Sequence, residues 1–206
     1  ESPKVKLRNA GSRIEFFLCD DIVIAGKFMS EIDKSHLKRK AHLRPSLHPT
    51  SMHPSLAKAC INLTGLSNGK ILDPFCGSGG ILIEVAKMGF DAIGYDIDEI
   101  QLKRAKLNLN HYGLNAALFK RDALKSIEKA DAIVTDIPYG KGSKVDDVNI
   151  LCDDFIKHAQ KLTNNVVLVY PDFIKPDFSG WKIEHKFDIY IHKSLTRKVT
   201  KLHYPH

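Results

Sequence analysis

The sequence predicts a doubly wound α/β domain whose mostly parallel sheet ends in an antiparallel hairpin. Between residues 70 and 170, short apolar runs of strand length alternate with stretches in which apolar residues recur at helical spacing. A glycine-rich turn with Gly77, Gly79 and Gly80 follows the first of these runs and opens a helix. From Trp181 to Tyr204 the chain alternates like two long strands without a helix between them, which favours antiparallel pairing.

The first 43 residues show patterns of a different kind. Residues 13–18 and 22–28 are apolar runs on either side of Asp20-Asp21, which predicts a β-hairpin outside the main core. A segment dense in Lys, Arg and His follows over residues 34–44. We therefore expect an N-terminal hairpin and basic linker over residues 1–43 and a main domain over residues 44–206.

The spacing of apolar residues predicts the elements of the main domain in order. Prolines at 45, 49 and 54 exclude regular structure for most of that stretch, and Pro54 suits the first turn of a helix. The residues of this helix that are predicted to face inward are Leu56, Ala59, Cys60 and Leu63. The strands expected after it are residues 70–73, 92–96, 116–119, 132–136 and 165–170, with helices over residues 80–88, 102–112 and 148–162.

The composition bounds the class of protein. The 206 residues are 43% hydrophobic and 27% charged, which suits one soluble globular core, and no apolar run is long enough to span a bilayer. The four cysteines form no CxxC pair, so we expect a reduced, cytoplasmic protein without a metal site. A net charge of +7 suits a polyanionic partner.

Acidic residues lie at or just after the ends of four predicted strands: Asp73, Asp96, Asp122 and Asp136. Because ligands of such sheets bind beyond the carboxyl ends of the strands, we expect these acids to share a site. Asp96 lies about 20 residues after the first glycine of the turn, where an acid holds ribose hydroxyls. This arrangement suits a dinucleotide as well as other nucleotide-like cofactors. Asp98 is expected to cap the helix that follows.

The sequence Asp136-Ile137-Pro138-Tyr139-Gly140 narrows the choice of cofactor. A strand that ends in acid-x-Pro-aromatic resembles motif IV of the enzymes that methylate exocyclic amines with S-adenosylmethionine. An aryl amine is a poor nucleophile because its lone pair is delocalised into the ring. The Asp136 carboxylate and the Ile137 carbonyl can each accept one N–H and so localise that lone pair. Pro138 fixes the backbone, and Tyr139 offers a face on which a base can stack.

Two further segments carry a resemblance to one family. His48 to Pro54 is similar to the His-Pro-Thr-x-x-x-Pro segment that lines the methionine end of the cofactor in several of these enzymes. Three segments together, Arg44 to Leu63, Asp73 to Glu84 and Thr135 to Gly140, make the chain resemble the archaeal and eukaryotic tRNA guanosine N2-methyltransferases that modify guanosine 10. The resemblance covers residues 44–200, including the tail around Arg197. Ile137 stands where the family often has a second proline, which is tolerable because only a backbone carbonyl is needed there.

This resemblance implies a Rossmann-like S-adenosylmethionine-dependent methyltransferase, with residues 44–206 as the catalytic domain, that methylates N2 of a guanosine in tRNA. It implies that Asp136, Pro138 and Tyr139 are catalytic. The residues that it implies for binding the cofactor are Thr50, Ser51, Met52, Asp73, Phe75, Gly77, Gly79, Asp96, Ile97, Asp122, Ala123 and Asp136.

The expected partner is tRNA, without a membrane. Members of the family usually carry an N-terminal RNA-binding THUMP domain, for which the 206 residues have no room. Either residue 1 follows a cut in a longer protein, or RNA capture relies on a partner, such as a separate THUMP-type domain or the small zinc-binding protein of eukaryotic relatives. The basic residues expected to contact phosphate are Lys34, Lys38, Arg39, Lys40, Arg44, Lys141 and Lys144.

Two other interpretations stay open. The chain could methylate a different amine, in DNA adenine or cytosine or in a protein glutamine, although Asp136 followed by Tyr139-Gly140 favours a base over glutamine. Alternatively, it could be a non-catalytic subunit that keeps the fold and binds RNA. Such subunits commonly lose the acid-Pro-aromatic motif, which is intact here.

Overall fold

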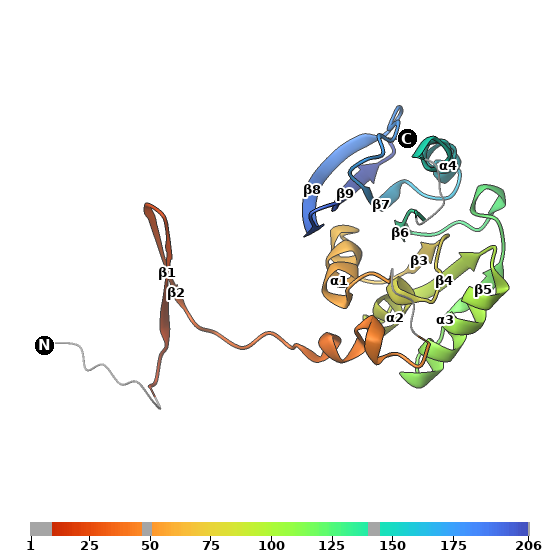
Figure 1. The fold of residues 1–206 in the computed structure, drawn as a ribbon. Coiled ribbons are helices and arrows are strands. Elements are labelled where there is room, and N and C mark those ends of the chain that lie inside the picture. The colour runs from red at the N-terminus through yellow and green to blue at the C-terminus, as the bar shows by residue number, and fades with distance from the viewer. Residues whose placement is uncertain (1–9, 47–50, 140–144, 206) are drawn as a thin grey trace, which may run out of the picture. The chain divides into compact units, whose positions relative to one another are not determined.

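The computed structural model describes residues 10–46, 51–139 and 145–205, and the chain divides into two compact units, Glu1–Lys34 and Ser35–His206. The first unit contains an antiparallel hairpin of β1 (Ile14–Cys19) and β2 (Ile22–Lys27) (Figure 1). Asp20 adopts φ of 46° in its two-residue turn, a left-handed conformation that Asp tolerates better than most residues. The hairpin predicted from the apolar runs is therefore present.

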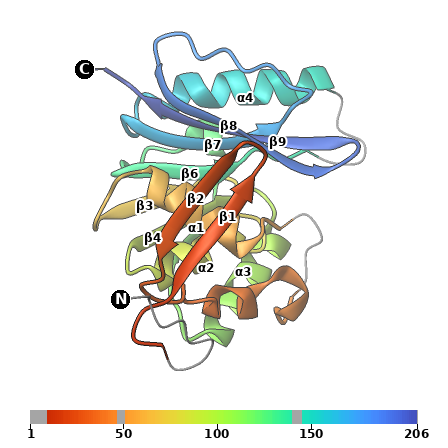
Figure 2. The same cartoon turned by 90° about the vertical axis from the view of Figure 1, so that its left-hand side faces the viewer.

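The second unit is built on a seven-stranded sheet in the order β5-β4-β3-β6-β7-β9-β8, whose strands are all labelled in Figure 1 and are seen from another side in Figure 2. Strands β5, β4, β3, β6 and β7 pair in parallel, and β9 pairs antiparallel with both β7 and β8. The strands are β3 (Lys70–Asp73), β4 (Asp91–Asp96), β5 (Ala117–Lys120), β6 (Ala132–Asp136), β7 (Asn165–Pro171), β8 (Lys182–His192) and β9 (Leu195–His203). The predicted doubly wound sheet with an antiparallel closing hairpin is confirmed.

Helices cover both faces of this sheet. On one face the buried side chains of α4 join Leu72 and Ile133, and on the other those of α1 and α2 join Ile71 and Val134. Neighbouring residues of a strand thus serve opposite layers, as the pleat requires. The α-helices are α1 (Pro54–Leu63), α2 (Gly80–Lys87), α3 (Glu99–His111) and α4 (Val145–Ala159), and the short 3-10 helices are η1 (Ser35–Arg39), η2 (Ala41–Leu43) and η3 (Ala123–Lys125).

The inward face of α1 differs from the predicted one. Ala59, expected inside, is exposed, whereas Ala57, Cys60 and Ile61 are fully buried. Two overlapping apolar stripes at helical spacing run along this helix, and spacing alone does not choose between them. The helix starts were predicted correctly: Pro54 opens α1, and the Asp98 carboxylate caps α3 by accepting from the backbone N–H of Ile100 at 2.8 Å.

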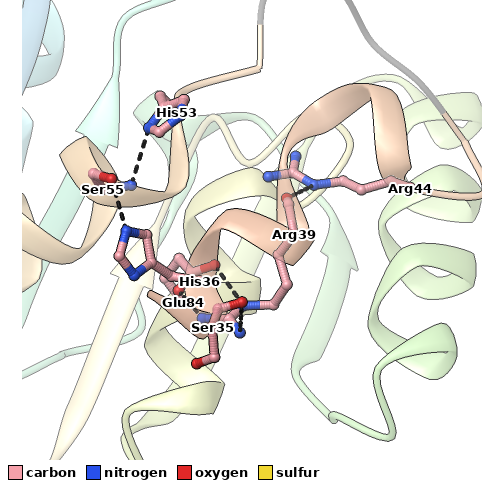
Figure 3. A network of polar contacts seen from close by, with 7 residues as sticks. All are labelled: Ser35, His36, Arg39, Arg44, His53, Ser55 and Glu84. Atoms are coloured by element: carbon pink, nitrogen blue, oxygen red, sulfur yellow. Dashed lines mark hydrogen bonds and ion pairs between the residues drawn. The ribbon is translucent and has the colours of Figure 1, made fainter. Parts of the chain in front are cut away.

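All of the basic segment except Lys34 belongs to the second unit, where Arg39 forms a buried ion pair (Figure 3). The Arg39 guanidinium donates through Nε and Nη2 to the two carboxylate oxygens of Glu84, at 2.8 and 2.7 Å, and Glu84 on α2 is completely buried. Arg44 Nε donates to the Arg39 carbonyl at 2.9 Å. Residues 35–43, predicted to form part of a linker, therefore lie with the second unit because Arg39 needs a buried partner.

This packing corrects part of the predicted phosphate-binding set. Arg39 and Arg44 are only 7% and 5% exposed, so their guanidinium groups point into the protein and cannot reach a polyanion at its surface. Lys34 and Lys38 are exposed, as expected of such contacts. Lys141 and Lys144 lie outside the described residues.

The described residues contain no helix that is both long enough and apolar enough to cross a membrane.

The Arg39–Glu84 pair predicts a large and specific effect on stability. Glu84→Gln keeps the side-chain shape but leaves the Arg39 charge buried without its counter-charge, which should lower the free energy of unfolding by about 3–5 kcal/mol in urea denaturation. The control is Glu128→Gln, which breaks the half-exposed ion pair with Lys70 and should cost about 0.5 kcal/mol or less.

Replacing both partners separates charge burial from packing. The double variant Arg39→Met and Glu84→Met removes both charges, so it should be more stable than Glu84→Gln alone. A Glu84→Gln protein as stable as the Glu128→Gln control would show that this pair does not hold the segment.

Candidate active site

A cavity of about 480 Å³ lies at the carboxyl ends of β3, β4 and β6. β3 and β6 are neighbours although β4 and β5 separate them in sequence, so this is the point where the strand order reverses, the usual ligand site of such sheets. The predicted site residues that line it are Ser51, Met52, Asp73, Phe75, Gly77, Asp96, Ile97, Asp122, Ala123, Asp136, Pro138 and Tyr139. Thr50 lies outside the described residues, and Gly79 is not among the lining residues.

The glycine turn between β3 and α2 requires two left-handed residues. Gly77 has φ of 50° and Gly79 has φ of 83°, conformations that residues with a Cβ adopt at a cost. A Cβ on Gly79 would lie 3.1 Å from the Cβ of Ala105, so Gly79 allows α3 to approach the turn. Gly79 therefore faces α3, which explains why it contributes to the packing of α3 against the turn and does not line the cavity.

Asp96 holds the turn in place from the neighbouring strand. Its Oδ2 accepts from the backbone N–H of Gly77 at 2.8 Å, and its Oδ1 accepts from that of Asp98 at 2.9 Å. Each carboxylate oxygen can accept more than one hydrogen bond, so Asp96 can still accept from ligand hydroxyls. Ile97 beside it is 71% exposed and lines the cavity, which gives the site an uncovered apolar surface.

Asp73 is buried at the end of β3. Its Oδ1 accepts from the Thr135 hydroxyl at 2.7 Å and from the backbone N–H of Phe75 at 3.3 Å. Burial raises the pKa of Asp73 to about 7, against the lowering effect of these hydrogen bonds, and the carboxylates of Asp136 and Asp96 add to the rise. The carboxylates at the ends of β3, β4 and β6 therefore interact with one another.

Asp136 ends β6, and its two carboxylate oxygens have different environments. Oδ2 lies 3.2 Å from Nη2 of Arg197, whereas Oδ1 is shielded from solvent and has no hydrogen-bond partner among the described residues. Burial raises the pKa of Asp136 to about 7, and Arg197 opposes that rise. The Tyr139 hydroxyl accepts from Arg197 Nε at 2.9 Å, and its ring meets Phe173 edge to face.

Ser46 and Ser51 connect the N-terminal part of the second unit to the glycine turn. The hydroxyls of Ser51 and Ser78 lie 3.0 Å apart. Asn108, buried on α3, donates to the carbonyls of both Ser46 and Ser78, at 3.1 and 3.0 Å, and so joins the residues just after the basic segment to the glycine turn. Met52, predicted as a cofactor contact, lines the cavity but is only 3% exposed and packs mainly in the core.

Two of the residues that line the cavity were missed by the sequence reasoning about the site and are cationic. Arg121 follows β5, and its guanidinium lies over the rings of Tyr95 and Phe119, 5.1 and 5.6 Å from their centroids. Arg197 lies near the start of β9. A buried carboxylate is stabilised by a cation nearby, but the sequence does not show which Lys or Arg supplies that cation.

The arrangement suits a nucleotide-like ligand that carries positive charge. Asp73, Asp96 and Asp136 place three carboxylates around one cavity, two of them with raised pKa, and a cationic group there would relieve their repulsion. The glycine turn and the exposed Ile97 provide close backbone approach and an apolar surface. The unpartnered Oδ1 of Asp136 can accept a hydrogen bond from a bound amine.

Comparisons with known proteins agree with this geometry. The sequence model of the family described as "RMKL-like, methyltransferase domain" matches residues 41–172. A tRNA (guanine(10)-N2)-dimethyltransferase of Methanothermobacter thermautotrophicus is 34% identical in an alignment 209 residues long, gaps included, that covers 95% of this chain and 62% of that protein. A shorter protein of Methanothermococcus thermolithotrophicus, named "Probable tRNA (guanine(10)-N2)-dimethyltransferase", is 35% identical over 70% of this chain and 94% of its own length.

Among solved structures, TrmN from Thermus thermophilus superposes with a TM-score of 0.69 at 24% identity, over 97% of this chain and 62% of that one. This likeness supports the fold. The chain spans about six-tenths of the length of the Methanothermobacter protein and of TrmN, so those proteins contain segments without a counterpart here.

The glycine turn gives a matched pair of variants. Gly79→Ala and Gly89→Ala both place a Cβ on a left-handed residue, which costs about 1–2 kcal/mol, but only at Gly79 would the Cβ meet a neighbour within 4 Å. Urea denaturation should show a larger loss of stability for Gly79→Ala. Equal losses would mean that Gly79 is needed for its backbone conformation alone and does not set the approach of α3.

Proposed function

This chain belongs to the family of RMKL-like methyltransferase domains, and from that premise we propose that it methylates N2 of a guanosine in tRNA with S-adenosylmethionine. Relatives that carry the name tRNA (guanine(10)-N2)-dimethyltransferase support guanosine 10 as the target. The observation that carries the proposal is the Asp136 carboxylate, which lines the cavity with one oxygen paired to Arg197 and the other without a hydrogen-bond partner in the part of the chain that the structure describes.

The residues of the cavity fit S-adenosylmethionine, which supplies an electrophilic methyl group when bound. Asp96 can accept from the ribose hydroxyls, and Ile97 offers its side chain to the adenine. Asp122 and Ala123, which begin η3, are assigned to the adenine edge. The turn at Gly77, together with Ser51, Met52, Asp73 and Phe75, is assigned to the methionine portion, whose cationic groups suit the neighbouring carboxylates.

Asp136 is assigned to the target amine. Its free Oδ1 accepts one N–H of the guanine amine, and the Ile137 carbonyl is the second acceptor in this proposal. These two hydrogen bonds localise the nitrogen lone pair, which is otherwise delocalised into the ring. As the nitrogen becomes cationic, the carboxylate stabilises the charge and accepts the proton that the product amine loses. The reaction therefore requires ionised Asp136.

Tyr139 and Pro138 hold the base. Pro138 is exposed and lies two residues after the end of β6. Tyr139 is partly buried, and its hydroxyl accepts a hydrogen bond from Arg197. A ring held in this way is a stacking surface for the guanine, worth about 1–3 kcal/mol.

The remaining elements of the proposal concern RNA capture. The net charge of +7 and the accessible lysines of the basic segment, Lys34 and Lys38, favour binding to the tRNA backbone. A THUMP-type domain or a small activator protein would supply further affinity. The four cysteines are free thiols, which supports a reducing, cytoplasmic location.

Cofactor binding tests the assignment of Asp96. Asp96→Ala removes charge-assisted hydrogen bonds and should weaken the calorimetric affinity for S-adenosylmethionine by about 2 kcal/mol or more. Asp98→Asn is the control, because its carboxylate caps α3 and does not line the cavity, and it should bind normally. Wild-type affinity in Asp96→Ala would remove this residue from the cofactor site.

Turnover tests the assignment of Asp136. Asp136→Asn keeps the shape but deletes the charge, and should slow single-turnover methylation of saturating tRNA by about 100- to 1000-fold. Cofactor affinity should change little, and Asp188→Asn, at an exposed position on β8, should be indistinguishable from wild type. If Asp136→Asn turned over normally, the amine mechanism would fail and a binding role without catalysis would gain support.

A further inference from the structure

Arg197 joins two of the residues that are assigned to the target base. Its Nη2 lies 3.2 Å from Asp136 Oδ2, and its Nε donates to the Tyr139 hydroxyl at 2.9 Å. Arg197 is 8% exposed and lines the same cavity. We propose that Arg197 is a positioning residue, which orients the Asp136 carboxylate and the Tyr139 ring toward the guanine. This inference rests on the proposed function and assigns a role in it to a residue of the antiparallel tail.

The register of the sheet explains how a residue so distant in sequence reaches the site. Asp136 pairs with Val169 between β6 and β7, and Arg197 pairs with Pro171 between β7 and β9. Because β9 runs antiparallel to β7, its first residues lie at the edge where the parallel strands have their carboxyl ends. The closing hairpin therefore brings the Arg197 guanidinium to the edge at which Asp73, Asp96 and Asp136 lie.

The planar guanidinium fixes two partners relative to each other. Nε and Nη2 point in the same plane with a rigid spacing, so the Tyr139 hydroxyl and Asp136 Oδ2 cannot move independently while both contacts hold. With Oδ2 anchored in this way, the unpartnered Oδ1 is the oxygen left for the amine. Lysine could supply the charge but not both directed contacts.

The charges that face Asp136 come from several elements. Asp73 at the end of β3 and the Cys60 thiol on α1 interact with it, as do Tyr139 on its own loop and Arg197 on β9. Burial raises the pKa of Asp136 to about 7, and Arg197 is the group that lowers it. Removing the guanidinium would raise this pKa further, so less carboxylate would be ionised at neutral pH.

The contacts of Arg197 with Asp136 and Tyr139 are not needed to hold β9 in the sheet. β9 already pairs with β7 from Asn165 to Pro171 and with β8 along its other edge, so backbone hydrogen bonds hold it in the sheet. A buried arginine that contacts both a carboxylate and a phenol of the cavity is better explained by its effect on those groups.

The experiment compares Arg197→Met and Arg197→Lys with Lys198→Met. Lys198 is the next residue and pairs with the exposed Asp188 on β8, so it is a matched control that removes a cation without touching the cavity. Single-turnover methylation at saturating tRNA and cofactor is measured from about pH 6 to pH 9. The Asp136 carboxyl resonance, assigned by its loss in Asp136→Asn, is followed by ¹³C NMR over the same range without RNA.

In the wild type, the rate should rise as the pH increases through about 7, where Asp136 ionises. Arg197→Met should be about 100-fold slower at pH 7. Its deficit should shrink toward pH 9, and its Asp136 titration should move to higher pH. Arg197→Lys should keep a titration close to that of the wild type but recover only part of the rate. Lys198→Met should match the wild type in both measurements, and all three variants should keep cofactor affinity within about twofold.

A wild-type rate and an unshifted Asp136 titration in both Arg197 variants would overturn the inference. A parallel loss of rate at every pH, with the titration unchanged, would likewise contradict it. If Arg197→Met does not fold, Arg197→Lys decides, because a full wild-type rate in that variant would exclude the directed contacts. If the wild type methylates no RNA, the proposed function fails, and the NMR titration still tests whether Arg197 controls Asp136.

Discussion

Three carboxylates at one edge of the sheet are the constraint on which the rest of the site depends. Parallel pairing brings the ends of β3, β4 and β6 together, and each of these strands ends in an aspartate. Each acid is held in a different way: Asp73 by the Thr135 hydroxyl, Asp96 by backbone N–H groups of the turn and α3, and Asp136 by Arg197. Only at Asp136 does a shielded carboxylate oxygen among the described residues lack a partner. In the proposed function, the three carboxylates favour a cofactor that carries positive charge, and Asp136 Oδ1 is the acceptor for the substrate amine.

The fold and the site differ in how far the sequence predicts them. Strand β6 was predicted at its observed bounds, and the Asp98 cap and the closing hairpin were also correct, because these depend on local apolar runs, local hydrogen bonds and chain order. The predicted acids gathered at one cavity because parallel strands share an edge. The burial of Arg39 and Arg197 could not be predicted from the sequence. A buried arginine has the same sequence pattern as an exposed one, and the carboxylates that pair with these two are far away along the chain. In α1, two overlapping apolar stripes left the buried face undetermined.

The buried Arg39–Glu84 pair connects the basic segment to the cavity. Glu84 lies on α2, the helix that the glycine turn opens, and Asn108 joins Ser46, two residues after the segment, to Ser78 in the turn. Residues 35–46 are therefore held against the glycine turn and the helix that follows it. Arg39 and Arg44, which were predicted to contact phosphate, are instead buried in the second unit, whereas Lys34 and Lys38 are exposed.

The central claim is that the Asp136 edge acts on an exocyclic amine of guanine. The direct measurement is transfer of an isotopically labelled methyl group from S-adenosylmethionine to unmodified tRNA, followed by digestion and nucleoside analysis. The account predicts label in N2-methylguanosine or N2,N2-dimethylguanosine. Label confined to a ring carbon of a pyrimidine, or to the amine of adenosine, would contradict it, as would a protein that binds S-adenosylmethionine and tRNA and transfers no label.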